Sequence, residues 1–143
     1  MSKSLEEIDI HELLPQQEPF VMVDKLTSFD MKTTTTNFTI REDNLFVEEG
    51  RLDTCALAEN IAQTCAARLG YYNKYVLKRG IQVGFIGAIR AFKVYVQPCV
   101  GDHLDTTINV LQDIMGITLV DAIVKRGEEV IAEGEMKIAL NNE

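Results

Sequence analysis

The sequence predicts an α+β fold in which one long helix packs on one antiparallel sheet. Residues 53–70 (DTCALAENIAQTCAARLG) contain no proline and are rich in good helix formers, which favours a single helix. A β-rich hairpin precedes this segment, and runs of strand-forming residues separated by short turns follow it. This order of elements is typical of a helix packed on one sheet.

Asp53 is a plausible N-cap of the predicted helix, and Gly70 closes it after about four to five turns. Seven of its residues are Ala or Cys, so neighbouring backbone can approach closely around most of its circumference. At 100° per residue, one continuous apolar arc is formed by Cys55, Ala58, Ile61, Ala62, Cys65, Ala66 and Leu69.

Glu59 falls at the edge of this arc, beside Gln63, and two interpretations are open for it. It is either a boundary carboxylate that faces water or a carboxyl group half buried beside a ligand tunnel. In the second case burial would raise its pKa and let it donate a proton near neutral pH.

The remaining elements are predicted from runs of β-branched residues and from the turn residues and prolines or glycines that separate them. A short helix or lead-in is expected at 4–14, ended by Pro15, and a second helical stretch or an ordered loop at 71–79. Strands are expected at 20–29, 33–40, 84–96, 103–115, 117–126 and 130–140, with a brief apolar piece at 45–47.

Length and composition indicate one cytoplasmic domain, residues 1–143. The chain is 46% hydrophobic and 25% charged, has no apolar run long enough to span a bilayer, and begins without a signal-peptide pattern. Cys55, Cys65 and Cys99 have no C-x-x-C spacing and read as small core residues, two of them on the helix. With only His11 and His103 in addition, no metal site and no cofactor are indicated.

The net charge of −8 argues against a nucleic-acid partner, but the charge is unevenly distributed. Residues 60–101 contain six Lys or Arg and no Asp or Glu, which gives +6 there and leaves −14 on the remainder. This asymmetry favours an acidic partner or an anionic ligand, although the cations could equally be spread over the surface.

Several short motifs, in this order, resemble the 3-hydroxyacyl-[acyl-carrier-protein] dehydratases of the FabZ and FabA type, and most closely their short ApeP-like branch. The motifs are 14–25 (LPQQEPFVMVDK), 46–47 (FV), 58–63 (AENIAQ), the glycine-rich 84–92 (GFIGAIRAF), 98–102 (PCVGD) and 133–136 (EGEM). The resemblance covers nearly the whole chain. It implies a hot-dog fold, in which an antiparallel sheet wraps a long central helix.

The resemblance also implies functional residues. Glu59 corresponds to the carboxyl group that protonates the departing hydroxyl, and Gln63 would orient it from one helical turn away. Gly84 or Gly87 would supply a backbone N–H to the thioester oxygen, and Phe85 and Arg90 would contact substrate. Docking of an acidic acyl carrier protein with its phosphopantetheine arm is expected at Lys74, Lys78 and Arg79, with Arg90 as a further candidate.

The chain departs from the family pattern at the catalytic base. No His occurs in 46–53 (FVEEGRLD), where FabZ-type enzymes carry it, and Arg68 stands where the ApeP-like branch tends to have one. A homodimer, or a heterodimer whose partner supplies the His, is therefore expected, with His11 and then His103 as internal substitutes. Three functions remain open: a dehydratase or dehydratase subunit acting in fatty-acid or polyene-type biosynthesis, a thioesterase, and a non-catalytic acyl-binding or scaffold subunit.

Overall fold

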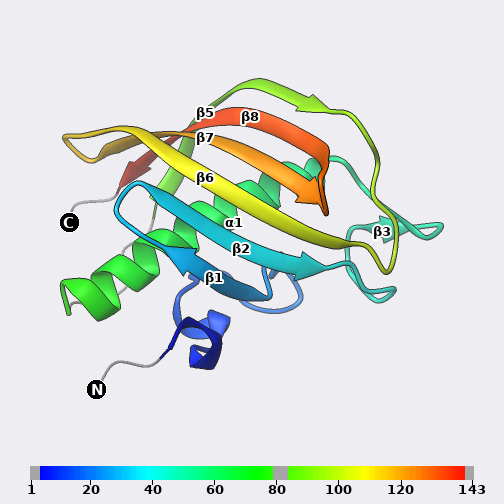
Figure 1. Ribbon diagram of the computed structural model, residues 1–143, viewed down its shortest axis with the longest axis horizontal. Helices are drawn as coiled ribbons and strands as arrows, with labels where there is room; N and C mark the ends of the chain where they lie inside the picture. The colour runs from blue at the N-terminus through cyan, green and yellow to red at the C-terminus, as the bar shows by residue number, and fades with distance from the viewer. Residues whose placement is uncertain (1–3, 79–83, 141–143) are drawn as a thin grey trace.

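A computed structural model describes residues 4–78 and 84–140, and its centre is one long helix, α1 (Cys55–Tyr71), wrapped by a curved sheet (Figure 1). In the described part the sheet has six strands in the order β1-β2-β6-β7-β8-β5, and all the pairings are antiparallel. The strands are β1 (Lys25–Phe29), β2 (Thr33–Thr39), β5 (Gly84–Val94), β6 (His103–Ile114), β7 (Ile117–Arg126) and β8 (Glu129–Leu140).

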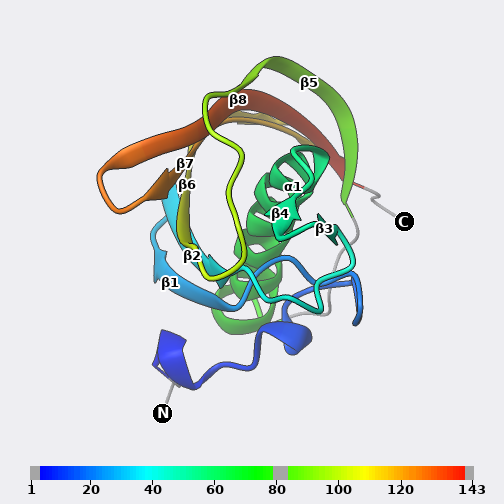
Figure 2. The same cartoon turned by 90° about the vertical axis from the view of Figure 1, so that its right-hand side faces the viewer.

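The sheet curls around the helix so that its two edge strands, β1 and β5, lie on different sides of α1 (Figure 2). The hairpin before the helix is β1 paired with β2, and the meander after it is β6, β7 and β8. Both were predicted, as was the helix, and the fold is the hot-dog fold that the resemblance implied.

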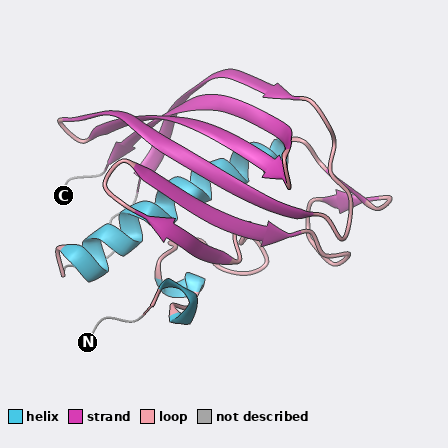
Figure 3. Cartoon of the chain, viewed as in Figure 1, coloured by secondary structure: helices cyan, strands magenta, loops and turns pink. Residues whose placement is uncertain are grey.

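Alternating burial explains why these segments form strands. In β2 every second side chain points to the helix and is buried, and the same alternation runs through most of β6 and β7. The sheet thus turns one largely buried face toward α1, which lies along its concave side (Figure 3).

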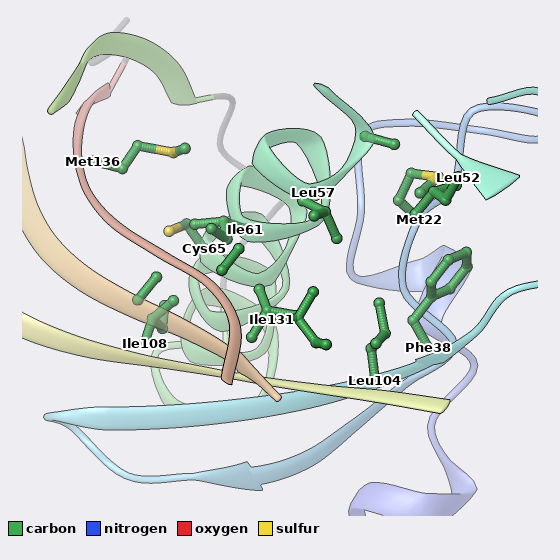
Figure 4. Packing of buried hydrophobic residues seen from close by; sticks show 14 of the residues in the cluster. Met22, Phe38, Leu52, Leu57, Ile61, Cys65, Leu104, Ile108, Ile131 and Met136 are labelled. Carbon is green, nitrogen blue, oxygen red and sulfur yellow. The ribbon is translucent and has the colours of Figure 1, made fainter. Parts of the chain in front are cut away.

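The main core lies between that face and the helix (Figure 4). Leu57 and Ile61 of α1 are buried with Leu104 and Ile108 of β6 and Ile131 of β8. Burying each such side chain contributes roughly 1.5–3 kcal/mol, so this layer holds the helix in the sheet.

A second apolar cluster covers the other side of α1. It is formed by the N-terminal segment, with the 3-10 helices η1 (Leu5–Glu7) and η2 (Ile10–Glu12), against β1 and the helix end. Gly70 makes this packing possible because a Cβ there would overlap the Leu13 carbonyl oxygen. The prediction that Gly70 ends the helix was wrong: α1 continues to Tyr71 and then into the π-helical turn η3 (Tyr72–Val76).

Two further boundaries differ from the expectation. The first strand begins at Lys25 and not at residue 20, because the backbone at Phe20 and Met22 bonds to helix side chains and not to a strand. Residues 45–47 lead into a small hairpin of β3 (Val47–Glu48) and β4 (Arg51–Leu52) ahead of α1.

Within the described ranges, no helix is both long and apolar enough to cross a membrane.

Candidate active site

A cavity of about 270 Å³ lies between α1 and the inner face of the sheet. Its volume is close to the lower end for small-molecule pockets. Most of its wall is apolar: the helix contributes mainly Ala62, Cys65, Ala66 and Leu69, and the sheet contributes residues such as Ile108 and Val120. Glu59 and Arg68 line the same cavity, so a carboxylate and a guanidinium are its charged groups on the helix side.

Glu59 is half-buried in this wall and is held by its neighbour on the helix. Gln63 Nε2 donates to Glu59 Oε1 at 2.8 Å, which is the contact that the spacing of four residues predicted. Gln63 is itself immobilised, because its Oε1 accepts from the Met22 N–H at 2.6 Å and its Nε2 also donates to the Phe20 carbonyl at 2.9 Å. The Glu59 carboxylate therefore has a defined position at the cavity.

Sequence reasoning missed Asn60, which is fully buried on the sheet side of α1. Its Nδ2 donates to the Met22 carbonyl at 2.7 Å, and its Oδ1 accepts from Thr106 Oγ1 at 2.5 Å. Asn60 and Gln63 together fasten the chain after Pro19 to the helix. The sequence contained a sign of this burial, because three polar residues lie within about one turn of the predicted helix: Asn60, Gln63 and Thr64.

The predicted apolar arc of α1 is only partly correct. Ile61 and Cys65 are buried, but Cys55 is exposed and the alanines of the arc are only partly covered. Because the sheet and the N-terminal segment cover the helix from two sides, polar residues outside the arc are buried as well.

Burial raises the pKa of the Cys65 thiol to about 12, an effect that the nearby Arg68 cation opposes.

Arg68 was also missed as a site residue, and its side chain is only 7% exposed. One terminal guanidinium nitrogen donates to the Met31 carbonyl at 3.3 Å, while the buried Nε has no hydrogen-bond partner. Three other buried side-chain atoms are without partners in the described part: Thr34 Oγ1, Asn37 Oδ1 and Oε1 of Gln16, and of these residues only Gln16 lines the cavity.

The residues predicted on β5 are only partly brought to this cavity. Gly84 lines it, together with the neighbouring Ile86, whereas Gly87 does not. Arg90 lies in a different groove with Glu135, on the opposite face of the sheet. The pairing of β5 with β8 shifts by one residue between Ile86 and Ala88, so side chains beyond this irregularity alternate the other way. Only the backbone of Phe85 is described, paired with Ala139, and its side chain lies outside the described part.

The predicted docking cations are also spread out. Lys74 pairs with Glu12 at 3.3 Å and Lys78 is exposed, whereas Arg79 falls outside the described residues.

Neither His reaches the cavity. His11 is exposed between Asp9, at 2.6 Å, and Glu18, at 2.9 Å, and these hydrogen bonds, that to Glu18 first, raise the pKa of the imidazole. His103 is exposed at the start of β6, where its Nδ1 lies 3.0 Å from Thr39 Oγ1. As far as the structure describes the cavity wall, it therefore contains a positioned carboxylate and no imidazole.

Comparison with known families gives a match to the ApeP-like (ApeP dehydratase) model over residues 8–143. The chain belongs to the ApeP-like dehydratase family.

Individual proteins similar to this chain are also named as dehydratases. A protein named 3-hydroxyacyl-[acyl-carrier-protein] dehydratase FabZ from Chlamydia muridarum is 30% identical, and one of the same name from Clostridioides difficile is 28% identical. Each alignment covers 92% of this chain and at least 90% of the relative. Among solved structures, a chain of "The Dehydratase Heterocomplex ApeI:P from Xenorhabdus doucetiae" superimposes with a TM-score of 0.88 at 18% identity, covering 95% of this chain and 93% of that one.

Proposed function

We propose that this ApeP-like chain is one subunit of a 3-hydroxyacyl-[acyl-carrier-protein] dehydratase and that a partner subunit supplies the catalytic base. The observation that carries the proposal is the Gln63-oriented Glu59 carboxyl group at an apolar cavity whose described wall holds no imidazole. Such a site offers an acid and a place for an acyl chain, but only half of an acid–base pair.

In the proposed reaction the base removes a proton from C2 of the 3-hydroxyacyl thioester. The C3–O bond breaks, the departing hydroxyl takes a proton from Glu59 and leaves as water, and a C2–C3 double bond forms. Gln63 acts as a positioning residue, because it holds Glu59 Oε1 while its own amide is fixed by the backbone at Phe20 and Met22. A backbone N–H near Gly84, which lines the cavity, is the candidate donor to the thioester oxygen.

The partner is proposed to be a second hot-dog subunit, either another copy or a His-bearing relative. The similar ApeI:P structure is that of a dehydratase heterocomplex, which supports the second form. An acyl carrier protein with its anionic phosphopantetheine arm remains the proposed substrate carrier. Of the docking cations, Lys78 is exposed and Lys74 already contacts Glu12.

The test is turnover of a 3-hydroxyacyl carrier thioester, followed by mass spectrometry, with the chain alone and mixed with a His-bearing hot-dog partner. Loss of water is expected in the mixture, and Glu59→Gln should reduce its rate by about 10²–10⁴-fold, the usual contribution of general acid–base catalysis. Glu128→Gln, in the exposed β7–β8 turn, is the matched control and should leave the rate unchanged.

The other functions give different products. Release of a free acid would indicate a thioesterase. Dehydration at the same rate with Glu59→Gln would show that this chain contributes no acid and acts as an acyl-binding or scaffold subunit.

A further inference from the structure

Arg68 is a buried cation without a charged partner. None of the ion pairs found among the described residues includes it, and its single described hydrogen bond goes to the neutral Met31 carbonyl at 3.3 Å. That distance is longer than usual for an N–H···O bond, and Nε is buried with no acceptor. Since a guanidinium stays protonated, this arrangement costs free energy until an acceptor reaches it.

A second unpaired group is expected near the same end of the helix, behind residues that line the cavity and not itself among them. The hydroxyl groups of Thr36 and Thr64 are 2.8 Å apart, which fixes how β2 lies against α1. Two residues back on the same face of β2 is Thr34, and one turn further on the helix is Arg68. Thr34 Oγ1 is fully buried and has no hydrogen-bond partner. The contact of Arg68 with Met31, just ahead of β2, agrees with this placement.

The cavity therefore has a charged group toward each end of its helix wall and an apolar middle. Glu59 and Arg68 are nine residues apart, which is about 13 Å along the axis of an α-helix. Between them the wall is formed by Ala62, Cys65 and Ala66, side chains suited to contact with methylene groups. A ligand that satisfies this wall is an apolar chain with an acceptor at its far end.

We infer that the cavity takes acyl groups whose far end carries a carboxylate, with Arg68 as its counter-ion. A guanidinium edge can donate two parallel hydrogen bonds to a carboxylate, and the unpartnered Nε–H belongs to such an edge. A methyl terminus would leave the Arg68 guanidinium at the cavity without an anionic partner.

The assignment of the other end to a thioester rests on the proposed function, whereas the pairing of Arg68 with a carboxylate does not. The two can therefore be tested separately.

The experiment compares the affinity of the full chain for two pantetheine thioesters of equal length, octanedioyl and octanoyl, by calorimetry. A second pair without the thioester, octanoate and octanol, is measured alongside. The carboxylate-bearing member of each pair is expected to bind at least tenfold more tightly. Arg68→Met and Arg68→Gln should abolish that preference while retaining the apolar contacts. Arg90→Met, which removes an arginine from the opposite sheet face, is the matched control and should keep it.

The outcomes separate the two proposals. Equal binding within both pairs, or a preference that persists in both Arg68 variants, overturns the carboxylate site. A preference that depends on Arg68, in a chain that dehydrates no 3-hydroxyacyl thioester with any partner, upholds the site and removes the proposed reaction.

Discussion

Asn60 and Arg68 are both buried polar residues of α1, about two turns apart, but their surroundings differ in one respect. The Asn60 amide bonds to the Met22 carbonyl and to Thr106, so the protein itself satisfies it. Arg68 Nε has no partner, and Arg68 lines the cavity. Buried polar groups are nearly always hydrogen-bonded. The difference therefore separates a polar cluster that stabilises the fold from one that is left for a ligand.

The largest expected effect is on folding stability. Asn60→Ala should lower the free energy of unfolding by about 2–4 kcal/mol, because it leaves the Met22 carbonyl and the Thr106 hydroxyl buried without partners. Arg68→Met should change it by less than about 1 kcal/mol or raise it, because an uncompensated buried charge is replaced by an apolar side chain of similar length. Urea denaturation of both variants makes the comparison.

A loss with Arg68→Met as large as that with Asn60→Ala would mean that Arg68 supports the fold. The distinction between the two clusters would then fail.

A smaller effect is expected from two threonines that share one face of β2. Thr36 and Thr34 are both completely buried, but only Thr36 has a hydroxyl partner, Thr64. Thr36→Val should cost about 1 kcal/mol of unfolding free energy, whereas Thr34→Val should cost nothing or stabilise the protein. The measurement is again urea denaturation. Equal losses in both variants would show that Thr34 has a partner in solution.

The smallest effect concerns His11, the internal substitute for the missing base. Its pKa is raised above 6.5, chiefly by Glu18 and then by Asp9, so its contribution to stability is present below about pH 6.5 and is lost as the pH rises through the raised value. His11→Ala should remove this pH dependence and leave dehydration unchanged. Thermal unfolding between pH 5 and 8 and turnover with a partner subunit are the measurements. A rate that falls about 100-fold would instead identify His11 as the base.

The helix, the hairpin before it and the meander after it could be predicted because their signals are local. Good helix formers without proline in 53–70 and β-branched alternation in 33–40 reflect contacts between residues a few positions apart. The resemblance to the dehydratases rests on short motifs in order. The spacing of four residues on the helix predicted the contact of Glu59 with Gln63, which the structure has, whereas their catalytic roles stay a prediction.

From the residues alone, the long helix, the hairpin, the meander and the family could be predicted. The partners of the polar side chains depend on the tertiary fold. Residues 20–24 are not a strand because helix side chains some 40 residues away take their hydrogen bonds, as Met22 with Gln63 shows. Arg90 and Arg68 look alike in the sequence, yet one faces away from the cavity and the other lies inside it. The register shift between Ile86 and Ala88 in β5 and the covering of the helix from two sides set these placements, and both depend on pairing with segments far apart in the chain.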